Sequence, residues 1–256
     1  MITKVRRRTS RRGGPMGPHA AGVVLAAGSG ARMGADTNKV YLPLAGRRVV
    51  SWSLEAFSRV PEIGVLVLVA RAEDRRLVEW VLDRELDGVP VEVVNGGATR
   101  QESELRALRW LASRIDDGAV DTVLLHDAAR PLVSPTLIAD VLHAAREHGG
   151  AIPGLPAEDL VAVAVAGGVG EIVGEQSLEG AIRVQTPQGF RAPALLDAYE
   201  QAAREQFLGT DTSSCMERYS SLPVRWVRGE QHNFKITYPH DLSVAEHFLA
   251  ASEYRT

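Results

Sequence analysis

Cysteine is almost absent from this sequence, which holds only Cys215 among 256 residues. A chain with one cysteine forms no internal disulfide, and nothing in it indicates an oxidising compartment, so we expect a cytoplasmic protein. One cysteine among seven scattered histidines also argues against a structural zinc site. Long apolar runs are lacking too. The longest, around residues 63–70, is far too short to cross a bilayer, so we expect no membrane partner.

Acidic residues are missing from the first fifteen positions, which contain six cations. The formal net charge of the whole chain is −3, so the remainder is more acidic than this total indicates. An acidic body argues against nucleic acid as the main partner. The amino-terminal segment also lacks the apolar core of a secretory signal. We expect residues 1–20 to form a disordered basic tail; the alternatives are a native start at Met16 rather than Met1, or a nucleic-acid tether.

Apolar residues make up 45% of the chain, enough for a substantial core. Short β-rich runs alternate with stretches of helical periodicity. The predicted strands are residues 22–25, 63–70, 91–94, 122–126 and 223–227, and the predicted helices are 49–60, 74–86, 99–112, 134–145, 192–206, 213–220 and 240–251. This alternation predicts an α/β fold with a doubly wound, mostly parallel, Rossmann-like sheet, in a single domain over residues 21–252.

The alternation breaks between about residues 156 and 182. Valine, alanine and glycine dominate there, and no helical period fits. We interpret this segment as an extended β arm. Such an arm is exposed unless it packs on something, so we expect it to be the contact of a homodimer.

A loop of small residues follows the first predicted strand and carries two cations. It reads Ala26-Ala27-Gly28-Ser29-Gly30-Ala31-Arg32-Met33, and Lys39 comes seven residues after Arg32. Glycines let backbone N–H groups approach a polyphosphate, and the cations neutralise its charge. Lys39 lacks the frame of a Walker loop, and Met33 stands where a dinucleotide fingerprint needs its third glycine. The loop therefore predicts a nucleoside triphosphate site of another kind.

Two other motifs follow predicted strands. Asp127 is a candidate Mg²⁺ ligand, because Mg²⁺ is held by one or two carboxylates plus phosphate oxygens; the alternative is a helix cap or an ion pair with Arg130. Gly96-Gly97 allows a flat base to pack on the backbone, or else starts a helix. Because parallel strands end at one edge of a sheet, we expect these motifs to lie beside the first loop.

Two further residues lie later in the chain. Thr186 precedes Pro187 in a turn expected to lead into a helix, where its hydroxyl meets a phosphate or caps that helix. Lys235 alternates with apolar neighbours, which indicates a side chain that points away from the core, towards solvent or a ligand.

Together and in this order, the motifs resemble the 2-C-methyl-D-erythritol 4-phosphate cytidylyltransferase family. The resemblance covers roughly residues 21–249. It rests on the first loop with Lys39-Val40-Tyr41-Leu42, on Gly96-Gly97 with Arg100 and Ser103, on His126-Asp127-Ala128-Ala129-Arg130-Pro131, on Gln185-Thr186-Pro187-Gln188-Gly189-Phe190, on Thr210-Asp211, and on Asn233-Phe234-Lys235-Ile236-Thr237 with Pro239 and Asp241.

The resemblance implies a nucleotidyltransferase fold and a reaction in which a polyol phosphate attacks the α-phosphorus of CTP. It implies catalytic roles for Arg32, Lys39 and Lys235 and a Mg²⁺ ligand at Asp127. It further implies that substrates contact Ala26, Ala27, Gly28, Gly30, Gly97, Arg100, Ser103, Ala128, Arg130 and Thr186, of which Ala26, Ala27, Gly28, Gly97 and Ser103 would surround the cytidine.

The sequence departs from the family pattern on the acceptor side. Leu160 and Ala162 replace a threonine and a lysine, and Leu178 stands where an arginine from the other subunit is expected. The leading hypothesis is cytidylyl transfer to methylerythritol phosphate. The alternatives are a cytidylyltransferase for another alditol phosphate, such as ribitol 5-phosphate, and a CTP-binding paralogue without turnover.

Overall fold

The computed structural model of the chain describes residues 19–28, 38–157, 163–166, 169–172, 180–209 and 211–253. Several expectations of the sequence analysis lie outside these ranges. They are residues 1–18 of the tail, Gly30 and Arg32 of the first loop, and the arm positions Leu160, Ala162 and Leu178.

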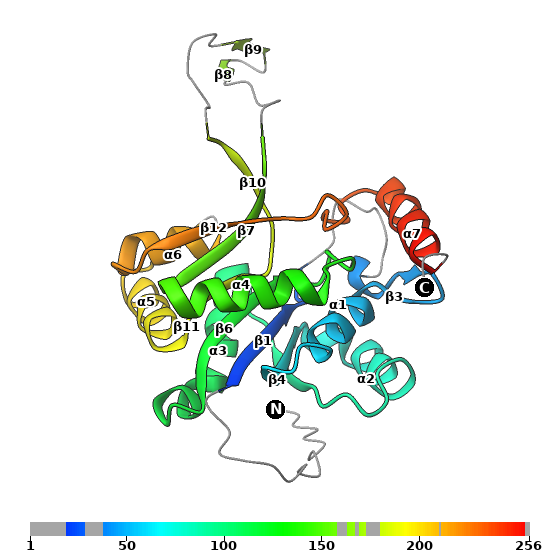
Figure 1. Ribbon diagram of the computed structural model, residues 1–256, viewed down its shortest axis with the longest axis horizontal. Helices are drawn as coiled ribbons and strands as arrows, with labels where there is room; N and C mark the ends of the chain where they lie inside the picture. The colour runs from blue at the N-terminus through cyan, green and yellow to red at the C-terminus, as the bar shows by residue number, and fades with distance from the viewer. Residues whose placement is uncertain are drawn as a thin grey trace.

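An eight-stranded sheet forms the centre of the structure (Figure 1). Its strands are, in spatial order, β10 (Ile182–Val184), β7 (Gly150–Pro156), β11 (Gln188–Arg191), β6 (Val120–Asp127), β1 (His19–Leu25), β4 (Ile63–Ala70) and β5 (Glu92–Asn95), and β12 (Val224–Arg228) pairs with β7. The run β6–β1–β4–β5 is parallel throughout, whereas β11 is antiparallel to β6 and to β7. The predicted doubly wound, mostly parallel sheet is confirmed.

Helices cover both faces of this sheet, because alternate residues of each central strand are buried on opposite sides. Val24 of β1 packs in one core cluster with α1 (Val49–Ser58), α2 (Arg75–Arg84) and α4 (Pro135–His148). Val23 packs in the other with α3 (Arg100–Asp116), α5 (Ala192–Arg204) and α6 (Thr212–Tyr219). Gly22 leaves room for α1, since a Cβ there would lie 2.4 Å from the ring of Phe57.

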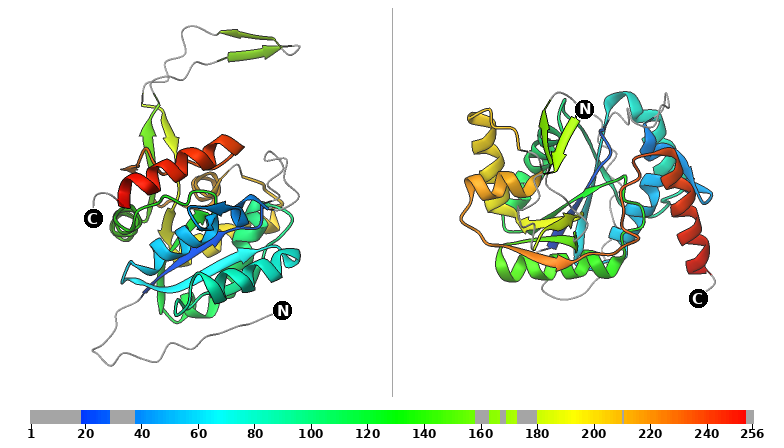
Figure 2. Two further views of the ribbon diagram at one scale, coloured as in Figure 1. Left: turned by 90° about the vertical axis from the view of Figure 1, so that its right-hand side faces the viewer. Right: turned by 90° about the horizontal axis from the view of Figure 1, so that it is seen from above.

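The carboxyl-terminal helix α7 (Pro239–Glu253) lies on the opposite side of the body from α5 and α6 (Figure 2). Ala245 of α7 joins a small core cluster with Leu44 of β2 (Pro43–Leu44), Val49 and Ile236. β2 pairs with β3 (Arg47–Arg48), just after the 3₁₀ helix η2 (Lys39–Tyr41). This packing brings the 233–237 loop across the sheet towards η2.

The β-rich character predicted for the arm is confirmed. β8 (Val163–Ala166) and β9 (Val169–Ile172) form an antiparallel pair of their own, and both figures show this pair projecting away from the body (Figures 1 and 2). At its base, β7 and β10 pair antiparallel. No helix in the described part of the chain is both long and apolar enough to span a membrane.

Some boundaries differ from those expected. β1 begins at His19, whose N–H donates to the carbonyl of Ala119, so the last two positions assigned to the tail belong to the sheet. The sequence analysis also missed β7 and β11, and Thr186 leads into strand β11 instead of a helix. β7 contains Pro153 and Gly154, which weaken a strand pattern read from sequence.

Candidate active site

The residues that flank the first loop, Ala26 and Asn38, are both held by hydrogen bonds. The N–H of Ala26 donates to the carbonyl of Val69 at 2.7 Å. At the other end, the buried amide Nδ2 of Asn38 donates to the carbonyl of Ala26 at 2.7 Å and to Asp74 Oδ2 at 3.0 Å. Lys39 follows at once, and its Nζ donates to the carbonyl of Ile236 at 2.8 Å. Both described ends of the loop are therefore tied together, with Lys39 beside the 233–237 loop.

The Gly96-Gly97 turn lies against the first loop. A Cβ on Gly96 would lie 2.4 Å from the Cβ of Ala27, so the two loops approach this closely only with glycine there. The hydroxyl of Ser103 accepts from the N–H of Gly97 at 3.0 Å and donates to the carbonyl of Thr99 at 2.8 Å. Thr99 caps α3, so the predicted helix start is confirmed, while binding of a base by this turn stays a prediction.

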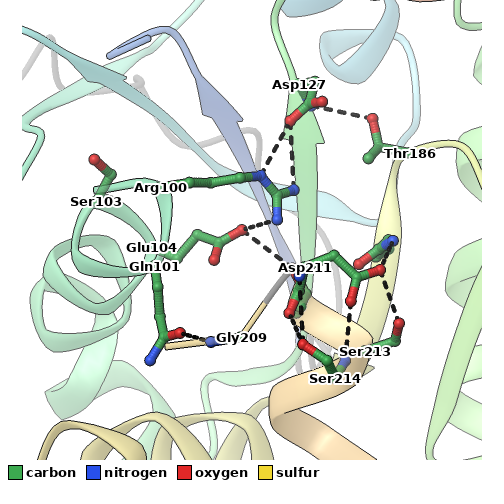
Figure 3. A network of polar contacts seen from close by, with 12 residues as sticks. Arg100, Gln101, Ser103, Glu104, Asp127, Thr186, Gly209, Asp211, Ser213 and Ser214 are labelled. Atoms are coloured by element: carbon green, nitrogen blue, oxygen red, sulfur yellow. Dashed lines mark hydrogen bonds and ion pairs between the residues drawn. The ribbon is translucent and has the colours of Figure 1, made fainter. Parts of the chain in front are cut away.

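Asp127 ends β6 and is surrounded by cations. Its Oδ2 lies 2.7 Å from Lys235 Nζ. Its Oδ1 lies 3.4 Å from the Arg100 guanidinium, as Figure 3 shows. Burial on its own would raise the pKa of Asp127, but Arg100, Lys235 and Arg130 outweigh it and hold the pKa well below its usual range. The carboxylate is therefore ionised at neutral pH.

The carboxylate of Glu104 forms an ion pair with Arg100 inside the core. Glu104 is 1% exposed, and its Oε1 lies 2.9 Å from Arg100 Nη1 (Figure 3). The hydroxyl of Tyr199 donates to Oε2 at 2.7 Å and that of Thr212 to Oε1 at 3.1 Å. Burial raises the pKa of Glu104, opposed by Arg100. Sequence reasoning missed this residue, although the spacing of four between Arg100 and Glu104 on a helix is a usable signal.

Arg130 and Thr186 have protein partners. Arg130 Nη1 donates to the carbonyl of Asn233 at 2.8 Å, and burial lowers the pKa of Arg130. The hydroxyl of Thr186 accepts from the N–H of Asp127 at 3.1 Å and lies 3.0 Å from His126 Nδ1. The helix-cap interpretation of Thr186 is wrong, because β11 and not a helix follows it.

The Thr210-Asp211 motif has a local role in its described part. Asp211 accepts from the N–H of Ser214 at 3.0 Å and forms a capping box at the start of α6 (Figure 3). Gln101 of α3 accepts from the N–H of Gly209 at 2.8 Å. The contact with Gln101 fastens Gly209 to the helix that carries Arg100.

A cavity of about 650 Å³ joins these parts at the carboxyl ends of β1, β5 and β6. The predicted site residues that line it are Ala27, Gly28, Lys39, Gly97, Arg100, Ser103, Asp127 and Lys235. The predicted residues that do not line it are Ala26, Ala128, Arg130 and Thr186, three of them almost fully buried. The clustering of the three strand-end motifs is confirmed.

The charge of this cavity suits a polyphosphate. Its lining includes four cations, Lys39, Arg71, Arg100 and Lys235, against the two carboxylates of Glu73 and Asp127. Arg71 and Glu73 come from the loop after β4, which the sequence analysis did not single out. Arg71 holds Asp74 with two hydrogen bonds of 2.7 and 2.6 Å, which orients it at the rim.

Metal ligands are few at the site. Among the described residues, no group of three or more histidine, cysteine, aspartate or glutamate side chains is placed to hold a metal ion. The ionised Asp127 fits a Mg²⁺ ion only if phosphate oxygens supply most of the remaining ligands.

Parallel strands that all end at a cation-lined cavity, with a glycine turn and a carboxylate at its wall, define an α/β nucleotidyltransferase. Comparison with known proteins gives the family. The chain belongs to the 2-C-methyl-D-erythritol 4-phosphate cytidylyltransferase family, whose model matches residues 20–251. The resemblance drawn from the motifs is confirmed.

Individual relatives agree with this assignment. The chain is 37% identical over 227 residues to a 2-C-methyl-D-erythritol 4-phosphate cytidylyltransferase of Bacillus mycoides, which covers 89% of this chain and 96% of the relative. It is 39% identical over 228 residues to the protein of that name in Geobacter metallireducens, with the same coverage of 89% and 96%.

Solved structures have the same fold. The 2-C-methyl-D-erythritol 4-phosphate cytidylyltransferase of Thermus thermophilus matches with a TM-score of 0.69 and 30% identity, over 89% of this chain and 98% of that one. The 4-diphosphocytidyl-2C-methyl-D-erythritol synthase of Anaerococcus prevotii matches with a TM-score of 0.77 and 27% identity, over 92% and 100%.

Proposed function

We propose that this chain transfers CMP from CTP to 2-C-methyl-D-erythritol 4-phosphate in isoprenoid biosynthesis. An oxygen of the acceptor phosphate bonds to the α-phosphorus of CTP, and the bond from that phosphorus to the β-phosphate bridging oxygen breaks. The products are CDP-methylerythritol and pyrophosphate. The observation that carries the proposal is the cation-lined cavity at the strand ends of a chain that belongs to this family.

The side chains at the cavity match what this reaction needs. No covalent intermediate is required, because phosphoryl-type transfer is accelerated by positioning and by stabilisation of charge. Lys39 lies beside the first loop, where the triphosphate is expected, and Arg32 belongs to the same loop. Lys235 Nζ lies beside Asp127, where an ammonium group would orient the attacking phosphate.

The base is expected at the Gly96-Gly97 turn. Ala27 and the two glycines leave a flat backbone surface, since any side chain on Gly96 would collide with Ala27. Ser103 orients the N–H of Gly97, which fixes the polar pattern of that surface. Ala26 and Ala128 are buried and do not line the cavity, so they support its shape from within the core.

Mg²⁺ is proposed as the cofactor, held by Asp127 and the phosphates of CTP. When bound, it would neutralise charge that develops on those phosphates. The carboxylate of Asp127 faces the cavity but already contacts Lys235 and Arg100. We therefore expect the ion to enter together with CTP.

We also propose that the protein is a cytoplasmic homodimer joined through the arm of residues 156–182. The projection of β8 and β9 beyond the body supports this assignment, because an isolated two-stranded sheet is marginally stable without a packing partner. The polyol phosphate would then meet residues of both subunits.

The test is a panel of acceptors. Purified protein is incubated with CTP, Mg²⁺ and one alditol phosphate at a time, and pyrophosphate release is measured. We expect turnover with methylerythritol phosphate. Turnover only with ribitol 5-phosphate or another alditol phosphate would assign a different substrate, and CTP binding without pyrophosphate release from any acceptor would refute the enzymatic assignment.

A further inference from the structure

Behind Asp127, three separate segments are joined by side chains that the reaction itself does not use. The segments are the end of β6 with residues 126–130, the turn at 184–186, and the loop at 233–235. His126, Thr186 and Asn233 connect them, with exposures of 0%, 4% and 0%. None of the three lines the cavity.

The hydrogen-bond partners of His126 fit only one of the two tautomers of a neutral imidazole. Its Nε2 lies 3.1 Å from the carbonyl of Arg130, which can only accept, so Nε2 carries the hydrogen. In a neutral imidazole, Nδ1 is then an acceptor and takes the hydroxyl hydrogen of Thr186, 3.0 Å away. The Thr186 oxygen in turn accepts from the N–H of Asp127 at 3.1 Å. Of the two neutral tautomers, only this one gives each contact one donor and one acceptor.

The chain of contacts closes into a ring through Asn233. Arg130 Nη1 donates to the Asn233 carbonyl at 2.8 Å, and Asn233 Nδ2 donates to the Thr186 carbonyl at 2.9 Å. Lys235 stands two residues further on, with its Nζ 2.7 Å from Asp127 Oδ2. The ring therefore fixes the backbone on both sides of the Lys235–Asp127 contact.

We propose that His126, as its Nε2–H tautomer, is a positioning residue for cytidylyl transfer that acts through Thr186 and Arg130 on Asp127 and Lys235. It touches neither substrate nor reacting atoms. The inference rests on the proposed function, and it assigns the Thr186 hydroxyl to this ring and not to a substrate phosphate.

The first test reads the tautomer directly and does not depend on activity. Long-range ¹H–¹⁵N correlation spectra of the imidazole, assigned with a His126→Asn sample, distinguish a protonated Nε2 from a protonated Nδ1. We expect a bare Nδ1 and a protonated Nε2 at pH 7.5. A protonated Nδ1 would overturn the proposal, because Thr186 would then have no acceptor for its hydrogen.

The second test uses substitutions that each remove one hydrogen bond of the ring. His126→Gln offers an amide near the Nε2 position for Arg130 but no acceptor for Thr186, and Thr186→Val removes the hydroxyl at constant shape. We expect each to lower kcat by about 10–100-fold, as is typical for residues that orient a functional group from behind. KM for CTP should change less than threefold, because the Gly96-Gly97 turn lies outside the ring. Thr186→Ser should restore kcat.

Coupling and controls complete the design. The double variant of His126→Gln with Thr186→Val should be no slower than the slower single variant, since both break one chain. His143→Gln, which changes an exposed histidine paired with Glu62, should leave kcat unchanged. If the wild-type protein turns over but the folded His126→Gln and Thr186→Val variants keep kcat within twofold, the proposal is overturned while the function stands. An inactive wild-type protein would refute the proposed function. The tautomer measurement would still show whether the hydrogen-bond ring exists as described.

Discussion

Replacement of Asp127 by asparagine tests the centre of the site without a change of shape. The carboxylate is 13% exposed, contacts Lys235 at 2.7 Å and lies 3.4 Å from Arg100. The amide oxygen still accepts from Lys235, so the loss of stability is smaller than the ~3–5 kcal/mol for breaking a buried pair outright. Lys235 is 38% exposed, which screens the pair further, and we expect a loss of about 1–2 kcal/mol.

The effect on turnover should be much larger than the effect on stability. Asp127 is the proposed Mg²⁺ ligand and the partner of Lys235, and loss of one electrostatic contact in a reacting site typically costs about 10²–10³ in kcat. Affinity for CTP in the absence of Mg²⁺ should hold or rise, because the cavity becomes more positive. Pyrophosphate release at several CTP concentrations separates kcat from KM, and urea unfolding gives the stability.

Asp121→Asn is the matched control. Asp121 lies near the opposite end of the same strand and holds Arg146 with hydrogen bonds of 2.9 and 3.1 Å. This variant also loses an ion pair on β6, but far from the cavity, so its kcat should be unchanged. If Asp127→Asn turned over within threefold of Asp121→Asn, our reasoning about the site would be refuted.

Three further predictions concern the base, the metal and pH. Gly96→Ala should raise KM for CTP at least about tenfold, since a Cβ 2.4 Å from that of Ala27 forces the loops apart; an unchanged KM would remove the turn from the nucleotide site. Titration calorimetry should detect no Mg²⁺ binding without CTP, because Asp127 is paired with cations; micromolar binding of free Mg²⁺ would contradict this. Burial lowers the pKa of His126 to about 4, so the unfolded state takes up a proton below pH 6.5 that the native state does not, and stability falls as pH drops through this window. From pH 7.5 to pH 5, the free energy of unfolding in urea should therefore fall by about 2 kcal/mol more in the wild-type protein than in the His126→Gln variant, in which the groups with raised pKa values, His232 and Glu104, still titrate; an equal fall in both proteins would place His126 in a different environment.

Much of the fold could be predicted from local pattern. β4 spans Ile63–Ala70 as its continuous apolar, valine-rich run indicates, and α4 begins after Ser134 with Pro135 at its first turn. These signals are local, because burial on both faces selects an apolar strand and a hydroxyl caps a helix within three residues. The parallel order then follows from alternation of strands and helices.

Strands β7 and β11 could not be predicted in the same way, and neither could the pairing of β12 with β7, although the pattern predicts a strand at residues 223–227. β11 runs antiparallel between β6 and β7, and β12 pairs with β7 although each paired residue is 74 positions away in the chain. Such pairings depend on which edge of the growing sheet is open. β7 contains glycine and proline, and β11 has only four residues, so neither carries a clear strand period. The same holds for Glu104, whose burial beneath Arg100 depends on packing of α3 against α5.

The identity and order of the chemical groups could be predicted from local patterns in the chain: the small-residue loop with Lys39, the glycine turn, Asp127 and Lys235. Each of these residue types has a chemical property that can be recognised without the structure. Their positions at strand ends follow from the hydrophobic periodicity of the chain. The contact of Lys235 with Asp127, 108 residues away, and the contact of the Thr186 hydroxyl with His126 depend instead on how the loops pack together. Contacts of that range are set by how three loops pack over one sheet edge, where burial requires each donor to find an acceptor, and no local pattern encodes that pairing.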